Sequence, residues 1–160
     1  MILVTVGMQL GFDRLIEAMD QLAPTLNHHV IAQTGRGDYV ARHLEQHVEI
    51  APWEFDDLMQ HAHLIVGHAG IGTVLAAVRS AKPLVLLPWR AALKEHRNDH
   101  QLATCRQLEG RSGIYPAFKT VDLSAAIASG LTFEGGEERR DDASLPLQEA
   151  VRQFIELGRL

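Results

Sequence analysis

A glycine-rich stretch at residues 67–73 is the part of the chain best suited to bind an anion. Its six last residues are His68, Ala69, Gly70, Ile71, Gly72 and Thr73. They follow the apolar run 64–66 and precede an apolar pattern of helical spacing, so the free N–H groups of a new helix would face a phosphate. No Gly-Lys-Ser/Thr sequence follows, and Leu75 occupies the third glycine position of the dinucleotide fingerprint. A tight strand-to-helix turn without a ligand is the alternative.

Two more stretches carry polar groups directly after a predicted strand. The first is the loop formed by Gly7, Met8 and Gln9, which offers backbone N–H groups or is a plain turn. The second spans residues 89–101, where side chains suited to sugar hydroxyls and phosphates gather: Arg90, Glu95, His96, Arg97, Asn98, His100 and Gln101. Asn98 is also a favourable N-cap residue for the helix that follows. A solvated loop would explain some of these residues.

Nine histidines raise the possibility of a metal site. His43 and His47 lie four residues apart, as do His96 and His100, so each pair would share a helix face. Neither pair has the glutamate directly after the first histidine that the zincin pattern requires. The sequence therefore predicts no metal and no other cofactor, and no serine nucleophile elbow is present.

The composition is that of a globular domain with one core. The chain has 160 residues, 46% of them hydrophobic and 22% charged, with a net charge of −5. The absence of a basic block argues against a nucleic-acid-binding protein. Cys105 is the single cysteine, which excludes disulfides and favours the cytoplasm. The first apolar run is too short for a signal peptide, and no stretch is long enough to span a membrane.

Short apolar runs alternate with helical patterns along the chain. Strands are predicted at residues 2–6, 30–33, 48–50, 64–67, 84–87 and 113–115, and helices at 12–22, 55–59, 72–80, 98–108 and 123–128, with a helical turn at 38–46. This alternation predicts a doubly wound, Rossmann-like parallel α/β sheet in a single domain of residues 1–160. A last amphipathic helix over about 144–157 packs on the sheet or docks a partner.

Three stretches together resemble glycosyltransferase family 28. They are the opening strand and loop at residues 4–15, the glycine loop at 68–73, and the long segment 88–104. The last of these is similar to the small catalytic subunits of bacterial exopolysaccharide and capsule glycosyltransferases. The resemblance runs from Met1 to about Gly113.

The resemblance implies the C-terminal half of a GT-B enzyme, which binds a UDP-sugar without a metal. By position, Gly70–Thr73 would hold the diphosphate, with the loop of Gly7 to Gln9 opposite. His100 and Gln101 would reach the donor sugar, and residues near Glu54 and Phe55 would flank the uracil. The family's ribose-binding glutamate is replaced by Ala76, so Glu95 is a candidate substitute, and Met8 stands where threonine is usual.

The function expected from this resemblance is an inverting transfer from a UDP-sugar to a lipid-linked saccharide in exopolysaccharide or capsule biosynthesis. Arg90 or Arg97 would stabilise the leaving diphosphate. The general base is His68 or a residue of a membrane-associated, acceptor-binding subunit that recruits the chain from the cytoplasm to the inner membrane face. Glucuronate, galactose and N-acetylglucosamine all remain candidate sugars. The alternatives are a non-catalytic nucleotide-sugar-binding enhancer subunit and an epimerase fragment.

Overall fold

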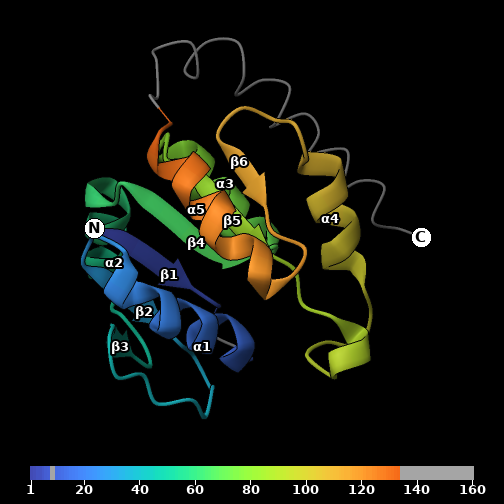
Figure 1. Cartoon of the computed structure of the whole chain (residues 1–160), viewed down its shortest axis with the longest axis horizontal. Coiled ribbons are helices and arrows are strands. Elements are labelled where there is room, and N and C mark those ends of the chain that lie inside the picture. The colour runs from blue at the N-terminus through green and yellow to red at the C-terminus, as the bar shows by residue number, and fades with distance from the viewer. Residues whose placement is uncertain (8–9, 134–160) are drawn as a thin grey trace.

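The protein is a six-stranded parallel sheet covered by helices on both faces (Figure 1). The computed structural model describes residues 1–7 and 10–133, so Met8, Gln9 and the helix predicted at 144–157 lie outside the described residues. The strands are β1 (Ile2–Thr5), β2 (Val30–Gln33), β3 (Glu45–His47), β4 (Leu64–His68), β5 (Leu84–Leu87) and β6 (Ile114–Pro116). Their order in the sheet is β3-β2-β1-β4-β5-β6, which confirms the predicted doubly wound fold.

The helices divide between the two faces of the sheet. They are α1 (Asp13–Leu22), α2 (Pro52–His61), α3 (Ile71–Arg79), α4 (His100–Leu108) and α5 (Leu123–Leu131), with short 3-10 turns η1 (Ala23–Thr25), η2 (Ala91–Leu93) and η3 (Thr120–Asp122). Helices α1 and α5 share one core with the sheet, whereas α2, α3 and α4 pack on the opposite face (Figure 1). None of the helices in the described ranges is long and apolar enough to cross a membrane.

Alternation along the central strands explains why both faces are apolar. In β1, Ile2 and Val4 point into the core under α1 and α5, and Leu3 points into the other core. Successive residues of a strand face opposite sides, so a sheet covered on both faces needs continuous apolar runs. These runs are the reason that the four-residue strands were detectable from sequence.

The third strand and its approach differ from the sequence-based prediction. Residues 38–44 form no helical turn, and β3 is Glu45–His47 rather than residues 48–50. This strand lies at the edge of the sheet and its side chains are partly or fully exposed, so its residues are polar. The β-branched Val48 and Ile50 suggested a strand, but pairing with β2 begins three residues earlier.

Asp20 on α1 holds the irregular segment before β3. Its buried carboxylate accepts hydrogen bonds from Arg42 N at 3.0 Å, His43 N at 2.6 Å and the Tyr39 hydroxyl at 3.0 Å. Burial alone would raise the pKa of Asp20, but these hydrogen bonds outweigh it and lower the pKa below its usual value. The segment before β3 is therefore held in an irregular conformation by a side chain of α1, where the local sequence predicted a helical turn.

Asp20→Ala is expected to lower the free energy of unfolding by about 2 kcal/mol, because three part-buried hydrogen bonds lose their charged acceptor. Urea unfolding measures the change. The matched control is Glu17→Ala on the exposed side of the same helix, with an expected change of about 0.5 kcal/mol or less. Equal effects of the two substitutions would contradict the role given to Asp20.

Candidate functional site

A cavity of about 860 Å³ opens at the carboxyl ends of the central strands. It lies where the chain order reverses between β1 and β4, the position at which doubly wound sheets bind ligands. Its walls come from the ends of β1, β2 and β4, from α2 and α3, and from the segment after β5. The lining residues are Thr5, Val6, Gly7, Gln33, Ile50, Pro52, Phe55, Asp56, Met59, His68, Gly70, Ile71, Gly72, Thr73, Ala76, Trp89, His100 and Gln101.

The first turn of α3 presents its backbone to this cavity. Gly70 is the N-cap residue and makes no side-chain capping bond, and the helix begins at Ile71. No acidic residue lies in the first turn. A Cβ atom built on Gly72 meets no atom within 4 Å, so open space lies next to this backbone. The N–H groups of the turn are therefore placed to bind an anion.

Gln101, at the start of α4, joins two of the loops around the cavity. Its buried side-chain oxygen Oε1 accepts hydrogen bonds from Ala69 N at 3.2 Å and from Trp89 N at 3.1 Å. One oxygen thus ties the glycine loop after β4 to the segment after β5. Gln101 lines the cavity, but its oxygen positions protein backbone, which leaves its amide nitrogen for a ligand.

His68 is packed among backbone and rings at the base of the cavity. Its ring stacks on Trp89 with centroids 4.8 Å apart, and a Cβ on Gly7 would lie 3.2 Å from its Cε1 atom. Gly7 also has a φ of +81°, a conformation that favours glycine. Burial lowers the pKa of His68 to about 4, so the ring is neutral at pH 7 and a weak base.

The segment after β5 is held by an ion pair with α1. The Arg14 guanidinium bonds both carboxylate oxygens of Glu95, at 2.6 and 2.9 Å, and donates to Pro88 O at 2.9 Å. The Glu95 carboxylate also accepts a hydrogen bond from Arg90 N at 2.8 Å. Glu95 does not line the cavity, so its carboxylate braces this segment and is not presented to a ligand.

The structure brings only part of the predicted set into the cavity. Gly7, Phe55, His68, Gly70, Ile71, Gly72, Thr73, His100 and Gln101 line it, whereas Ala69, Arg90, Glu95, His96, Arg97 and Asn98 do not. Ala69 is buried, and His96 stacks on the far side of Trp89 with centroids 5.3 Å apart. Arg97 and Asn98 are exposed.

Nine of the 18 residues that line the cavity were not among the predicted site residues, and two of these, Trp89 and Asp56, bear on ligand binding. Trp89 is stacked between His68 and His96, and its place directly after a buried strand and Pro88 was the signal available. Asp56 is the one carboxylate among the described lining residues. It lies on α2 between Phe55 and Asp57, and nothing in the local sequence distinguishes it from Asp57.

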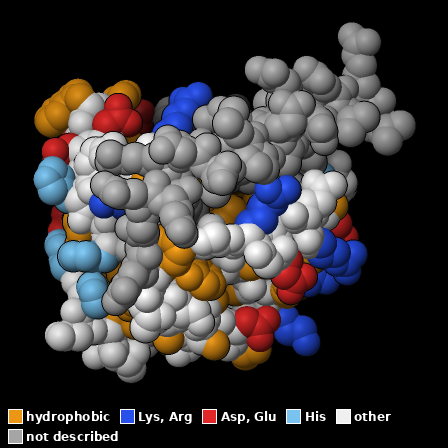
Figure 2. Space-filling model, turned by 90° about the horizontal axis from the view of Figure 1, so that it is seen from above, with side chains coloured by type: hydrophobic (Ala, Val, Ile, Leu, Met, Phe, Trp, Pro, Cys, Tyr) orange, Lys and Arg blue, Asp and Glu red, His pale blue; other side chains and the backbone are white. Residues whose placement is uncertain are grey.

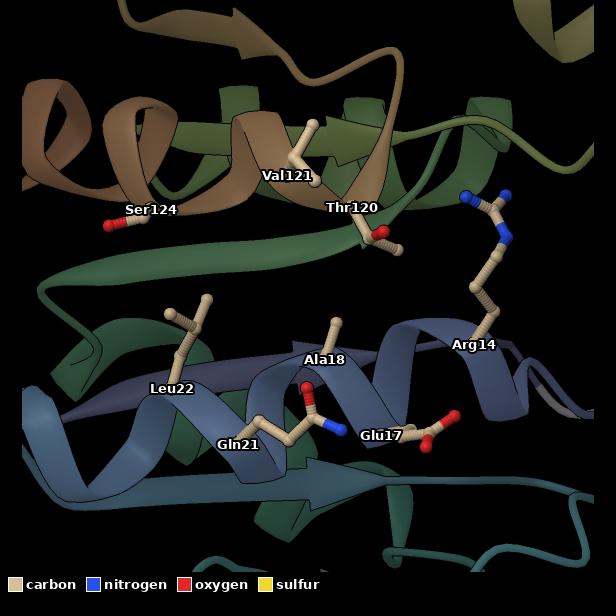
Figure 3. A pocket seen from close by; sticks show the side chains of 8 residues that line it. All are labelled: Arg14, Glu17, Ala18, Gln21, Leu22, Thr120, Val121 and Ser124. Carbon is tan, nitrogen blue, oxygen red and sulfur yellow. The ribbon is translucent and has the colours of Figure 1, made fainter.

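A second hollow of about 430 Å³ lies between α1 and the η3–α5 segment (Figure 3). Its lining residues are Arg14, Glu17, Ala18, Gln21, Leu22, Thr120, Val121 and Ser124. In Figure 3, Arg14 stands at one end of this hollow, and its guanidinium is already paired with Glu95. The hollow has no glycine loop, and its one cationic side chain is already paired, so the first cavity is the better candidate.

Surface charge and the grouping of possible metal-binding side chains both bear on the kind of ligand that the chain could bind. Acidic and basic side chains are interspersed among the coloured residues of Figure 2, which shows no continuous basic patch on that face. Within residues 1–7 and 10–133, no three His, Cys, Asp or Glu side chains are grouped to hold a metal ion.

The fold and the position of the cavity define a Rossmann-like α/β domain with a cavity at the switch point of its sheet. The chain belongs to glycosyltransferase family 28, because residues 1–156 match the family's C-terminal domain.

Two relatives place the chain within that family. It is 32% identical over 116 residues to the UDP-N-acetylglucosamine–N-acetylmuramyl-(pentapeptide) pyrophosphoryl-undecaprenol N-acetylglucosamine transferase of Granulibacter bethesdensis, covering 67% of this chain and 29% of that one. It is 36% identical over 101 residues to the UDP-N-acetylglucosamine transferase subunit ALG13 of Yarrowia lipolytica, covering 54% and 52%. The chain thus matches about a third and about half of the length of these relatives.

Solved structures agree on the fold. The calicheamicin glycosyltransferase CalG4 superposes with a TM-score of 0.64 at 19% identity, covering 99% of this chain and 43% of that one. The glycosyltransferase of kitacinnamycin gives the same TM-score and identity, covering 94% and 39%. The described domain therefore corresponds to one half of a GT-B glycosyltransferase.

The low pKa of His68 predicts a pH-dependent stability. The unfolded histidine titrates near 6.5 and the folded one near 4, so the contribution is full above pH 6.5 and is lost as the pH falls towards 4. The free energy of unfolding of the wild type, minus that of His68→Gln, should fall by about 3 kcal/mol between pH 7 and pH 4. The exposed His61→Gln is the control, and a pH-independent difference for His68→Gln would show that His68 is not buried neutral.

Proposed function

We propose that this chain is the donor-binding half of an inverting glycosyltransferase that uses a UDP-sugar. The observation that carries the proposal is the uncapped first turn of α3, which faces the cavity with open space beside Gly72. An anionic diphosphate suits that turn, because free N–H groups and the helix dipole both favour negative charge. Membership of glycosyltransferase family 28 supports the same ligand.

The cavity offers distinct surroundings for the three parts of such a donor. Phe55 and Met59 on α2 give an apolar wall for the base, and the start of α3 takes the diphosphate. His100 and Gln101, at the start of α4, lie on the wall formed after β5 and suit sugar hydroxyls. In the reaction, the acceptor oxygen bonds to the anomeric carbon, the bond to the diphosphate oxygen breaks, and UDP leaves while its charge is stabilised by the helix N–H groups.

A partner is proposed to supply the proton acceptor. With a pKa of about 4, His68 is a weak base towards a sugar hydroxyl at neutral pH, and its ring is fixed against Trp89. Arg90 and Arg97 lie outside the cavity wall, so their proposed charge stabilisation would require the segment after β5 to move when a donor or partner binds. The base would then come from the half that binds the acceptor.

Exposed apolar side chains near the strand ends fit such a partner. Leu10 follows β1, Trp53 lies in the first turn of α2, and Leu93 lies in η2 after β5; they are 43%, 76% and 56% exposed. Apolar side chains of this size are typical of protein contacts when they cluster. We propose an acceptor-binding, membrane-associated subunit on this edge and a lipid-linked saccharide acceptor, as in exopolysaccharide or capsule biosynthesis.

Asp56 is proposed to hold the ribose. Ala76 lines the cavity on α3 and offers no polar group, and the Glu95 carboxylate is bonded to Arg14. Asp56 is the carboxylate available on the described wall, and a carboxylate can accept hydrogen bonds from both hydroxyls of a ribose diol. Asp56→Asn should therefore weaken UDP binding about tenfold, as expected for the loss of charged hydrogen bonds.

Isothermal titration calorimetry with UDP tests the Asp56 role. The matched control is Asp57→Asn, one residue further along α2 and absent from the cavity wall, which should leave the Kd for UDP within twofold of the wild type. Equal affinities of Asp56→Asn and Asp57→Asn would assign the ribose to another residue.

Gly72→Val tests the diphosphate site itself. The new side chain enters open space, so the melting temperature should stay within about 2 °C, while UDP binding should weaken at least about tenfold because the ligand's space is filled. Ala103→Val, on an exposed position of α4, is the control for a β-branched residue in a helix. Wild-type affinity in a folded Gly72→Val protein would remove the α3 turn from the site.

Transfer itself requires the partner. Co-expression with a candidate membrane subunit and a panel of UDP-sugars should move labelled sugar to a lipid-linked acceptor, and Gly72→Val in this chain alone should abolish it. Full transfer by the variant complex would instead assign the chain an enhancer role.

A further inference from the structure

Asn98 lies at the start of α4, but its side chain does not cap the helix. The sequence predicted Asn98 as the N-cap, whereas the N-cap residue is Asp99, which makes no side-chain capping bond. Asp99 Oδ1 instead accepts a hydrogen bond from Ala91 N at 2.8 Å. Asn98 Oδ1 is hydrogen-bonded to Nδ1 of the His100 ring, two residues further on.

That hydrogen bond decides which ring nitrogen of His100 carries the proton. An amide oxygen has no proton to donate, so Nδ1 must be the donor in this pair. In a neutral imidazole the other nitrogen, Nε2, then has a free lone pair and acts as an acceptor. His100 is one of the residues that line the cavity.

The surroundings of His100 keep the ring neutral. Burial lowers the pKa of His100, and the neighbouring His96, with ring centroids 4.7 Å apart, lowers it further. His100 also lies in the first turn of α4, where the helix dipole disfavours a positive charge. The ring is therefore an acceptor at Nε2 and not an imidazolium that would donate from both nitrogens.

We propose that Asn98 is a positioning residue that fixes His100 with Nε2 as a hydrogen-bond acceptor, so that the site selects a ligand hydroxyl that donates to it. This inference rests on the proposed function, in which that hydroxyl belongs to the sugar of the donor. Without Asn98 the ring can carry its proton on Nε2, and it would then present a donor where the hydroxyl proton should go. Asn98 acts through His100 and touches no part of the ligand.

The tautomer is measured directly in the full chain labelled with ¹⁵N-histidine. Long-range ¹H–¹⁵N correlation spectra distinguish a protonated Nδ1 from a protonated Nε2 and need no ligand. Wild type and Asn98→Asp should both show His100 protonated on Nδ1 alone, because a carboxylate is also an acceptor; the spectra are recorded at about pH 9, where the ring stays neutral even though the new carboxylate raises its pKa. Asn98→Leu should shift the proton towards Nε2. A wild-type ring protonated on Nε2 would overturn the inference.

Binding gives the second readout. For the UDP-sugar that the wild type binds more tightly than UDP, the ratio of the two affinities should fall about 3- to 10-fold in Asn98→Leu, as expected for one neutral hydrogen bond. UDP binding alone should stay within twofold. Asn98→Asp should retain most of the ratio, and the control Asn27→Leu, in an exposed turn before β2, should retain all of it. An unchanged ratio in Asn98→Leu would contradict the role of Asn98.

Different results would contradict the proposed function and the role of Asn98. If the wild type binds neither UDP nor any UDP-sugar, the proposed function is wrong even though the tautomer stands as measured. If nucleotide-sugar binding is present and the His100 tautomer is insensitive to Asn98→Leu, only the role of Asn98 is wrong.

Discussion

The site depends on one buried carbonyl oxygen, Oε1 of Gln101, which accepts a hydrogen bond from each of two loops. A buried acceptor with two backbone donors is costly to disturb, because both N–H groups would be left without a partner. Through these bonds the start of α4 fixes the glycine loop at Ala69 and the segment after β5 at Trp89. The cavity wall is therefore one connected unit, although its parts lie about thirty residues apart in the chain.

Other contacts extend this unit to the first strand and the first helix. His68 packs against Gly7 and stacks on Trp89, and the Arg14–Glu95 ion pair joins α1 to the segment that follows Trp89. Several polar side chains of that segment thus hold protein rather than ligand. The groups left for a ligand include the backbone of the α3 turn, Asp56, the amide nitrogen of Gln101 and the His100 ring.

Much of the fold was predictable because buried parallel strands need continuous apolar runs, as residues 64–66 and 84–87 show. The glycine loop was predictable for a similar reason, since it interrupts such a run before a helix. The edge strand β3 was misplaced because it is polar and its approach is held by Asp20, a residue of α1 that no local pattern connects to it. Glu95, Asn98 and Asp56 illustrate the same limit: residue type shows what a side chain can bond, and only the tertiary structure shows what it bonds.

The most direct test of the central claim is a map of backbone amide shifts on adding UDP to the ¹⁵N-labelled chain. The account predicts that the largest changes occur at Ile71, Gly72 and Thr73, with smaller changes at Gly7 and Phe55 around the same cavity. Residues of the hollow between α1 and α5, such as Ala18 and Val121, should not respond. Changes confined to that hollow, or no response to millimolar UDP, would contradict the assignment of the α3 turn as the diphosphate site.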